Sequence, residues 1–279
     1  MKRLKAWLKG LARSFGYDVV GIEEPDPARD VFVALRALRN DPNLLDVEIV
    51  FLEYCLSNFK RSSAQVFQDL FVQFILGDKR GGYFVEFGAT NGIILSNTLM
   101  LEEHFGWRGI LAEPSRQWHD ALKKNRRVDI DLRCVWTRTG DRLEFTEAVM
   151  GEFSTIAKYV SRDMYADLRS GGKKYIVESV SLSDLLNSHN APNHIDYISI
   201  DTEGSELPIL QAFPFDRDIS IFTIEHNFVK NERDTIYWLL RSKGYSRVFE
   251  RFSAWDDWYI KSELGDRLRN GPLGVKPPE

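Results

Sequence analysis

Cysteine is scarce in this chain, which has only Cys55 and Cys134 among its 279 residues. Two cysteines cannot form a disulfide framework, and their scarcity fits a reducing compartment. The sequence also lacks an uninterrupted apolar run near the ~18–20 residues that a membrane span requires. We therefore expect a cytoplasmic protein without a membrane-spanning helix.

A strong charge of one sign is missing as well. The chain has 37 lysine and arginine residues against 41 aspartate and glutamate residues, for a formal net charge of −4. No global basic field points to nucleic acid, so we expect no nucleic-acid partner. The composition is 43% hydrophobic and 13% aromatic, which is ample for the core of one large domain with or without an extension.

Basic residues do gather in residues 1–20, MKRLKAWLKGLARSFGYDVV. Leu4, Leu8 and Leu11 recur there at helical spacing with Trp7 beside them, and lysine and arginine fill much of the rest. Such a basic amphipathic helix either makes a peripheral contact with an anionic membrane surface or docks on the protein's own body. Its apolar stretches are too short for a secretory signal.

The hydrophobic pattern divides the chain into three parts. Residues 1–62 predict a helical N-terminal extension, residues 63–262 the main domain, and residues 263–279 a flexible C-terminal tail. In the main domain, short apolar strands alternate with amphipathic helices, which is typical of a doubly wound α/β fold with a mostly parallel sheet. Short alternating pieces between residues 141 and 186 predict an antiparallel insertion.

Two element predictions bear on the site described below. The apolar spacing of IILSNTLMLEEHFG predicts a helix that begins near Ile94 and ends before Gly106. The run DLRCVW predicts one strand over residues 131–136.

The stretch YFVEFGATNGIILSN combines a buried strand with a glycine turn. Glu86 precedes Gly88 and Gly92, and the phosphate-binding pattern Gly-x-Gly-x-x-Gly is absent. A carboxylate there repels a diphosphate and attracts a cation. S-adenosylmethionine carries an ammonium and a sulfonium and no phosphate, so we expect Glu86 near the ammonium and Glu113, after the next strand, on the ribose hydroxyls. The alternative is that Glu86 caps the next helix and Glu113 lies on the surface.

Three runs together resemble the FkbM-type S-adenosylmethionine-dependent methyltransferases: SSAQVFQDLFVQFIL, YFVEFGATNGIILSNTLMLEEHFGWRGILAEPS and IDYISIDTEGSELPILQAF. The resemblance covers about residues 62–252 and implies a Rossmann-like methyltransferase that usually modifies hydroxyl groups, often on sugars or natural products. The chain departs from the family at Phe67, where a glycine is frequent, and at Thr90, where asparagine is common.

The resemblance also implies site residues by position. The cofactor-binding residues would be Glu86, Gly88, Asn91, Gly92, Glu113 and Asp201, and the family's acidic motif matches Asp201, Glu203 and Gly204.

Chemistry on a hydroxyl acceptor requires that its proton be removed. Asp201 and Glu203 follow one predicted strand, and His226 follows the next within Glu225-His226-Asn227. Neighbouring strand ends lie about 5 Å apart, so we predict Asp201, Glu203 and His226 as the catalytic residues. A histidine base and a divalent cation such as Mg²⁺ or Mn²⁺ both remain open. Without such a role, these residues form a polar loop and a helix N-terminus.

The predicted function is S-adenosylmethionine-dependent methylation of a hydroxyl on a small-molecule or glycan acceptor, either a saccharide or a natural product. Two alternatives remain. One is a non-catalytic module that binds the cofactor or a glycan. The other is a nicotinamide-dependent oxidoreductase, which would have to bind its cofactor without the phosphate turn.

Overall fold

The computed structural model describes residues 27–39, 41–148, 151, 154–156, 159 and 171–270. The basic helix predicted at residues 1–20 lies outside these residues, as do the last nine residues of the predicted tail. The chain divides into two compact units, Met1–Leu45 and Asp46–Glu279. The described part of the first unit contains the helix α2 (Pro27–Leu38).

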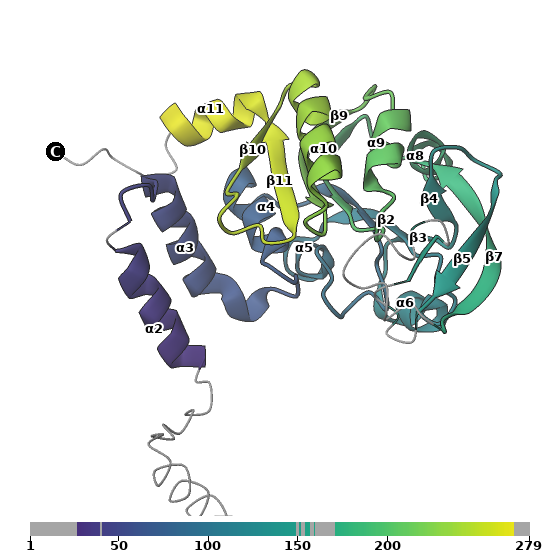
Figure 1. The fold of residues 1–279 in the computed structure, drawn as a ribbon, viewed down its shortest axis with the longest axis horizontal. Coiled ribbons are helices and arrows are strands. Elements are labelled where there is room, and N and C mark those ends of the chain that lie inside the picture. Colours follow the sequence, from purple (N-terminus) through teal and green to yellow (C-terminus); the bar gives the residue numbers. More distant parts are fainter. Residues whose placement is uncertain are drawn as a thin grey trace, which may run out of the picture. The chain divides into compact units, whose positions relative to one another are not determined.

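The second unit is built on a seven-stranded sheet with the order β10-β11-β9-β8-β1-β2-β3. Neighbours from β9 through β3 pair in parallel, whereas β11 is antiparallel to both β9 and β10. This arrangement confirms the doubly wound, mostly parallel fold (Figure 1). The strands, in spatial order, are β10 (Tyr245–Val248), β11 (Asp256–Lys261), β9 (Asp218–Glu225), β8 (His194–Ile200), β1 (Tyr83–Phe87), β2 (Arg108–Ala112) and β3 (Asp129–Asp131).

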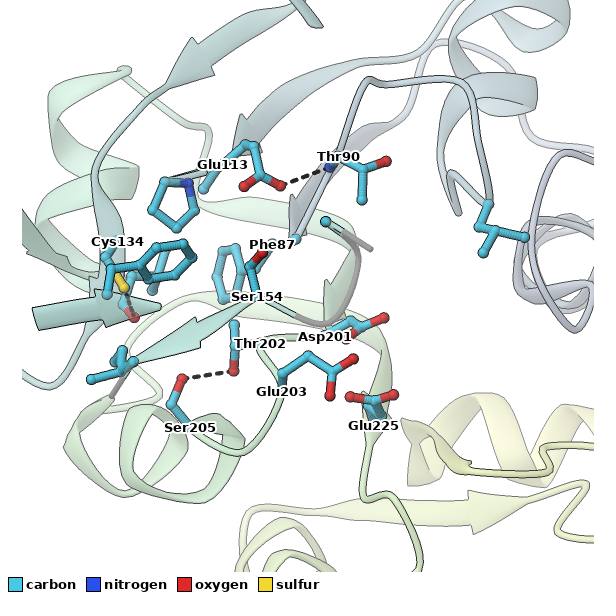
Figure 2. A pocket seen from close by; sticks show the side chains of 18 of the residues that line it. Phe87, Thr90, Glu113, Cys134, Ser154, Asp201, Thr202, Glu203, Ser205 and Glu225 are labelled. Atoms are coloured by element: carbon cyan, nitrogen blue, oxygen red, sulfur yellow. Dashed lines mark hydrogen bonds between the residues drawn. The ribbon is translucent and has the colours of Figure 1, made fainter. Parts of the chain in front are cut away.

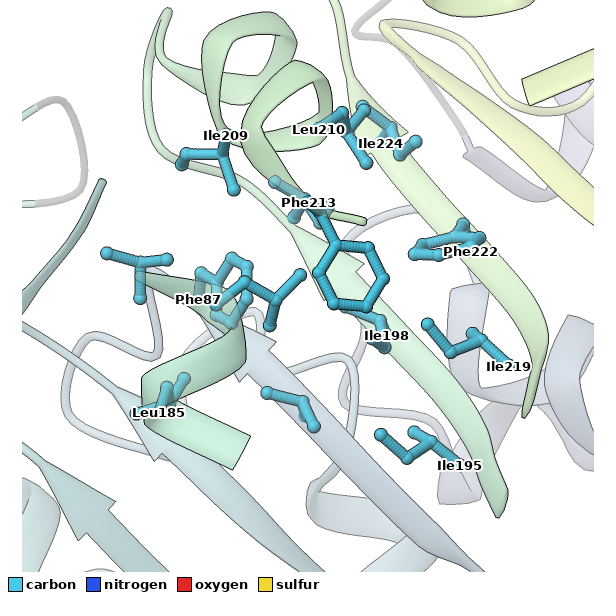
Figure 3. Close-up of a cluster of buried hydrophobic side chains, with 14 of the residues drawn as sticks. Phe87, Leu185, Ile195, Ile198, Ile209, Leu210, Phe213, Ile219, Phe222 and Ile224 are labelled. Carbon is cyan, nitrogen blue, oxygen red and sulfur yellow. The ribbon is translucent and has the colours of Figure 1, made fainter. Parts of the chain in front are cut away.

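Helices cover both faces of this sheet, because side chains along each strand alternate between the two faces. Val85 and Ile198 pack on one face, and Phe84 and Tyr197 on the other. Figure 3 shows the first of these two clusters. The first face carries α8 (Leu182–Ser188), α9 (Glu206–Ala212) and α10 (Lys230–Ser242); the second carries α3 (Asp46–Asn58), α4 (Gln68–Leu76), α5 (Leu99–Phe105), α6 (His119–Asn125) and α11 (Ser262–Asn270).

Helix α3 was expected to belong to the extension, but it packs into the main unit. The Phe51 ring lies 4.8 Å from the Phe249 ring, 6.0 Å from that of Trp258 and 6.4 Å from that of Phe71. A short 3₁₀ turn (Phe59–Arg61) then leads towards α4, which ends at Leu76, before Gly77 with its φ of 64°. The compact unit therefore begins at Asp46, before the boundary expected near residue 62.

A second, four-stranded sheet confirms the antiparallel insertion. Its order is β4 (Cys134–Trp136), β7 (Lys173–Ser181), β5 (Arg142–Glu147) and β6 (Thr155–Ile156), with only β4 and β7 parallel. The single strand predicted over residues 131–136 was wrong, since β3 ends in the main sheet and β4 begins in the second. The Asp131 carboxylate turns the chain between them by accepting hydrogen bonds from the Arg133 backbone and guanidinium, at 2.6–2.9 Å.

The helix predicted to begin near Ile94 starts only at Leu99. Residues 93–98 form a loop in which Leu95 has a φ of 56°. Residues 263–270 were predicted to begin a flexible tail, but they belong to helix α11, whose Leu264 and Leu268 pack on the core. Among the described residues, no helix has the length and apolar character that crossing a membrane requires.

Candidate active site at the carboxyl ends of the strands

A cavity of about 190 Å³ opens where the carboxyl ends of β1, β2, β8 and β9 meet the second sheet. Strand β1 pairs with β2 on one side and with β8 on the other, which makes this edge the switch point of the sheet. Ligands of open α/β sheets bind at such points. The described lining comprises Gln65, Phe87, Gly88, Thr90, Ile94, Leu95, Ala112, Glu113, Pro114, Cys134, Val135, Phe145, Gly151, Ser154, Ile156, Asp201, Thr202, Glu203, Ser205, Glu225 and Trp255 (Figure 2).

Gly88 brings the end of β1 against the end of β8. Its φ is 75°, and a Cβ atom added there would lie 2.1 Å from the backbone oxygen of Asp201. Its N–H donates to the Ala112 carbonyl of β2 at 3.0 Å. Only glycine fits this position, because any side chain would push β8 away from the turn.

Glu113 stands at the end of β2 with both carboxylate oxygens held by the backbone. The N–H groups of Thr90 and Ser115 donate to it at 2.8 Å and 2.7 Å. Burial raises the pKa of Glu113 to about 8, since desolvation outweighs these two hydrogen bonds. The carboxyl lines the cavity.

Asn91 and Gly92 shape the turn and lie outside the lining. The Asn91 side-chain oxygen accepts from the N–H groups of Ile93 and Ile94, both at 2.9 Å. A Cβ at Gly92 would lie 2.6 Å from the Arg126 side chain, so this glycine lets α6 approach the turn.

Glu86 is buried behind the turn and does not line the cavity. The Asn97 N–H donates to it at 2.7 Å, and the hydroxyls of Ser96 and Thr98 also donate. The buried guanidinium of Arg126 lies 3.8 Å from the same carboxylate. The cation beside Glu86 is therefore the protein's own arginine, and the contact of Glu86 with a ligand ammonium stays a prediction.

Three carboxylates gather at the ends of β8 and β9. One oxygen each from Asp201, Glu203 and Glu225 lie within 4.8 Å of one another. Figure 2 shows the three carboxylates pointing toward one another at the cavity. Desolvation raises the pKa of Asp201 to about 6, and burial together with Asp201 raises the pKa of Glu225 well above its usual range.

Backbone geometry and one further acid hold this cluster in place. Glu203 adopts a φ of 57°, and the Asn227 amide donates to its carboxylate at 3.2 Å. The buried Glu206 accepts from the Thr202 N–H and hydroxyl and from the Gly204 N–H, at 2.8–3.1 Å. The loop after β8 is thus fixed before any ligand binds.

His226 turns away from the cavity. Its Nε2 lies 3.0 Å from the Asp256 carbonyl, and its Nδ1 accepts from the Phe228 N–H at 3.0 Å. Burial lowers the pKa of His226. Both ring nitrogens are therefore bonded to the main chain, which leaves neither for a substrate proton.

The structure brings part of the predicted site together. Gly88, Glu113, Asp201 and Glu203 line one cavity, whereas Glu86, Asn91, Gly92 and His226 lie behind it. Glu225 belongs to the site because it is the last residue of β9, a signal that the sequence contains. Arg126 carries no such signal, because it reaches Glu86 through a tertiary contact. Glu206 was not predicted, although its contacts with Thr202 and Gly204 are local.

The order of this mostly parallel sheet and the glycine turn at its switch point fit a Rossmann-like fold with a cofactor site at the carboxyl ends of its strands. Residues 86–268 match the family described as "Methyltransferase FkbM domain". The chain belongs to this family. Its resemblance to FkbM-type methyltransferases is thereby confirmed, and the protein is a methyltransferase enzyme.

Solved structures also resemble the chain at low identity. SAH-bound methyltransferase PaMTH1 of Podospora anserina is 10% identical over 87% of this chain and 99% of that one, with a TM-score of 0.42. Human methyltransferase 10 domain containing protein is 11% identical over 77% and 96%, with a TM-score of 0.37. Precorrin-6y C5,15-methyltransferase of Geobacter metallireducens is 12% identical over 64% and 72%, with a TM-score of 0.36. A search among curated proteins found no match.

Proposed function

We propose that this methyltransferase transfers the methyl group of S-adenosylmethionine to a hydroxyl group of a saccharide or natural product. The observation that carries the proposal is the shared cavity, which has Glu113 at one end and Asp201, Glu203 and Glu225 at the other. The sulfonium already activates the methyl group. The protein must therefore position the acceptor and assist loss of its proton, and carboxylates can accept a hydrogen bond from a hydroxyl.

The roles divide along the cavity. Glu113 accepts hydrogen bonds from the ribose, and Gly88 lets the cofactor approach the backbone. Asp201 and Glu203 orient the acceptor hydroxyl. His226 has no part in this scheme, because its ring nitrogens are bonded to the main chain.

The cavity mouth suits an acceptor with a flat apolar face. Ile94 and Leu95 are about half exposed and line the mouth together with Trp255, whose indole N–H donates to the Gln65 side chain at 3.0 Å. An indole held in this way can stack on the face of a sugar ring or on an apolar ring system.

The test is a methyl-transfer assay with methyl-labelled S-adenosylmethionine and a panel of saccharides, natural-product alcohols and amines. We expect labelled methyl ethers, identified by mass spectrometry. Glu203→Gln should lower turnover at least about 100-fold, the scale of a lost acid–base contact, with cofactor affinity nearly unchanged. Glu113→Gln should instead weaken cofactor binding. Labelled amines without labelled ethers would contradict the proposal.

A further inference from the structure

Glu225 has a side-chain oxygen that no donor of the described residues reaches. The residue is 6% exposed, its carboxyl is hydrogen-bonded to that of Asp201, and within the described part of the chain its Oε2 has no other partner. Buried polar atoms are nearly always satisfied, so an orphaned carboxylate oxygen in a cavity wall indicates a ligand. A cation in the cavity would displace the proton that Glu225 holds in the free protein, and the ionised carboxylate then only accepts, so the ligand that suits it is a donor or a cation.

The surroundings of Glu225 favour a cation. Asp201 and Glu203 each bring an oxygen within 4.8 Å of it and of each other, and no lysine or arginine is among the described residues that line the cavity. A divalent cation with oxygen ligands at about 2.1–2.5 Å holds those oxygens about 3–5 Å apart. One oxygen of each of the three side chains already lies within 4.8 Å of the other two.

The support around the three carboxylates also resembles that of a metal site. Carboxylates that bind metals are usually held by further hydrogen bonds. Here Asn227 donates to Glu203, and Glu206 fixes the Thr202 and Gly204 backbone between Asp201 and α9. The cluster is therefore oriented by neighbours that do not belong to it.

We propose that Asp201, Glu203 and Glu225 bind one hard divalent cation, Mg²⁺ or Mn²⁺, which in turn binds the acceptor's hydroxyl oxygen. The acceptor part of this inference rests on the proposed function. The cation stabilises the alkoxide, and the hydroxyl proton passes to solvent. The S–CH₃ bond then breaks with its electron pair left on sulfur, as the O–CH₃ bond forms. The products are a methyl ether and a neutral thioether.

The first experiment measures Mn²⁺ binding to the full-length, metal-free protein by calorimetry and electron paramagnetic resonance. We expect one ion per chain. Glu225→Gln and Asp201→Asn should each weaken binding at least tenfold, whereas Glu103→Gln, at an exposed acid on α5, should leave it unchanged. Circular dichroism establishes that each variant is folded, and Asp201→Asn decides the matter if Glu225→Gln does not fold.

Two results would overturn the inference: absence of saturable Mn²⁺ binding, or displacement of Mn²⁺ by S-adenosylmethionine in direct competition. Displacement would mean that the three carboxylates bind a positively charged group of S-adenosylmethionine itself. Exhaustive chelation should abolish methyl-ether formation without loss of cofactor binding, and Mg²⁺ or Mn²⁺ should restore it. Ether formation that survives chelation overturns the cation and leaves the proposed function standing. Specific Mn²⁺ binding without any hydroxyl acceptor supports the cation and counts against the function.

Discussion

At the scale of single residues, ionisation of Glu113 should govern cofactor affinity. Burial raises the pKa of this carboxyl to about 8, so in the free protein it is largely protonated at neutral pH. The ionised form is the one that accepts hydrogen bonds from ribose and attracts a cationic ligand. Cofactor affinity should therefore rise with pH and approach its limit above pH 8, with a slope of up to about tenfold per pH unit below that value.

The measurement is calorimetric titration of the protein with S-adenosylmethionine between pH 6.5 and 8.5. Glu113→Gln should weaken binding by about 1–3 kcal/mol at the upper end and flatten the pH dependence. Because the cofactor's own amino group also titrates near this range, the difference between variant and wild type is the readout. Parallel pH curves for the two proteins would remove Glu113 from the ribose site.

Gly88 offers a second prediction at this scale. Gly88→Ala combines a φ of 75° with a Cβ only 2.1 Å from the Asp201 carbonyl oxygen. Gly140 has a similar φ of 85° but nothing within 4 Å of an added Cβ, so Gly140→Ala isolates the backbone strain. Gly140→Ala should cost about 1 kcal/mol of unfolding free energy, and Gly88→Ala clearly more, with weaker cofactor binding. Urea denaturation and calorimetry test both variants, and equal costs would contradict the close approach of β1 and β8.

At the scale of elements, α3 should be indispensable to the main unit. Phe51 is 2% exposed and packs on Phe71, Phe249 and Trp258, so Phe51→Ala should lower the unfolding free energy by about 3–5 kcal/mol. Ile49 lies on the same helix and is 41% exposed, and Ile49→Ala should cost well under about 1 kcal/mol. Urea denaturation of the two variants decides between a core helix and a dispensable extension. Equal stability of both would favour the extension.

Most elements of the main unit could be predicted, because their signals are local. The period of the apolar residues and the residue at the end of an element locate it in the sequence. This holds for the helix before Gly77 and for the strands that end at Phe87 and Glu225. The start of α5 could not be predicted. Ile94 fits the helical spacing, but residues 96–98 are drawn into a loop by hydrogen bonds to Glu86.

The difference between local sequence signals and contacts of distant residues also explains which parts of the candidate site could be predicted. Glu113, Asp201 and Glu203 follow directly from strand ends, which a hydrophobic pattern locates. The position of Glu86 was equally visible, but its partner was not: Arg126 lies after α6, and nothing near it in the sequence marks it as the neighbour of Glu86. His226 was predicted to be catalytic because histidine is a common catalytic residue. Its two ring nitrogens are instead hydrogen-bonded to main-chain groups, which the sequence does not reveal.

At the scale of the whole molecule, the chain passes almost directly from β3, in the main sheet, into β4, in the second sheet. Two residues separate β3 from β4, and the Asp131–Arg133 contact makes the corner between them. The second sheet can therefore supply Cys134, Val135 and Phe145 to the cavity wall while the main sheet keeps its order. One wall of the cavity is thus set by the main sheet and another by the second sheet.

The pairing of β1 with β8 also determines how long one edge of β1 stays unpaired while the chain is synthesised. Phe84 pairs with Tyr197 and Val85 with Ile198, so one edge of β1 stays open until β8 has left the ribosome. At typical translation rates of about 5–20 residues per second, that interval lasts roughly 6–20 seconds. Strands β1, β2 and β3 can already associate during this time, and the open edge of β1 is then a template for aggregation. Phe51 must wait longer still for Phe249 and Trp258, so we expect the nascent protein to depend on chaperones until translation is nearly complete.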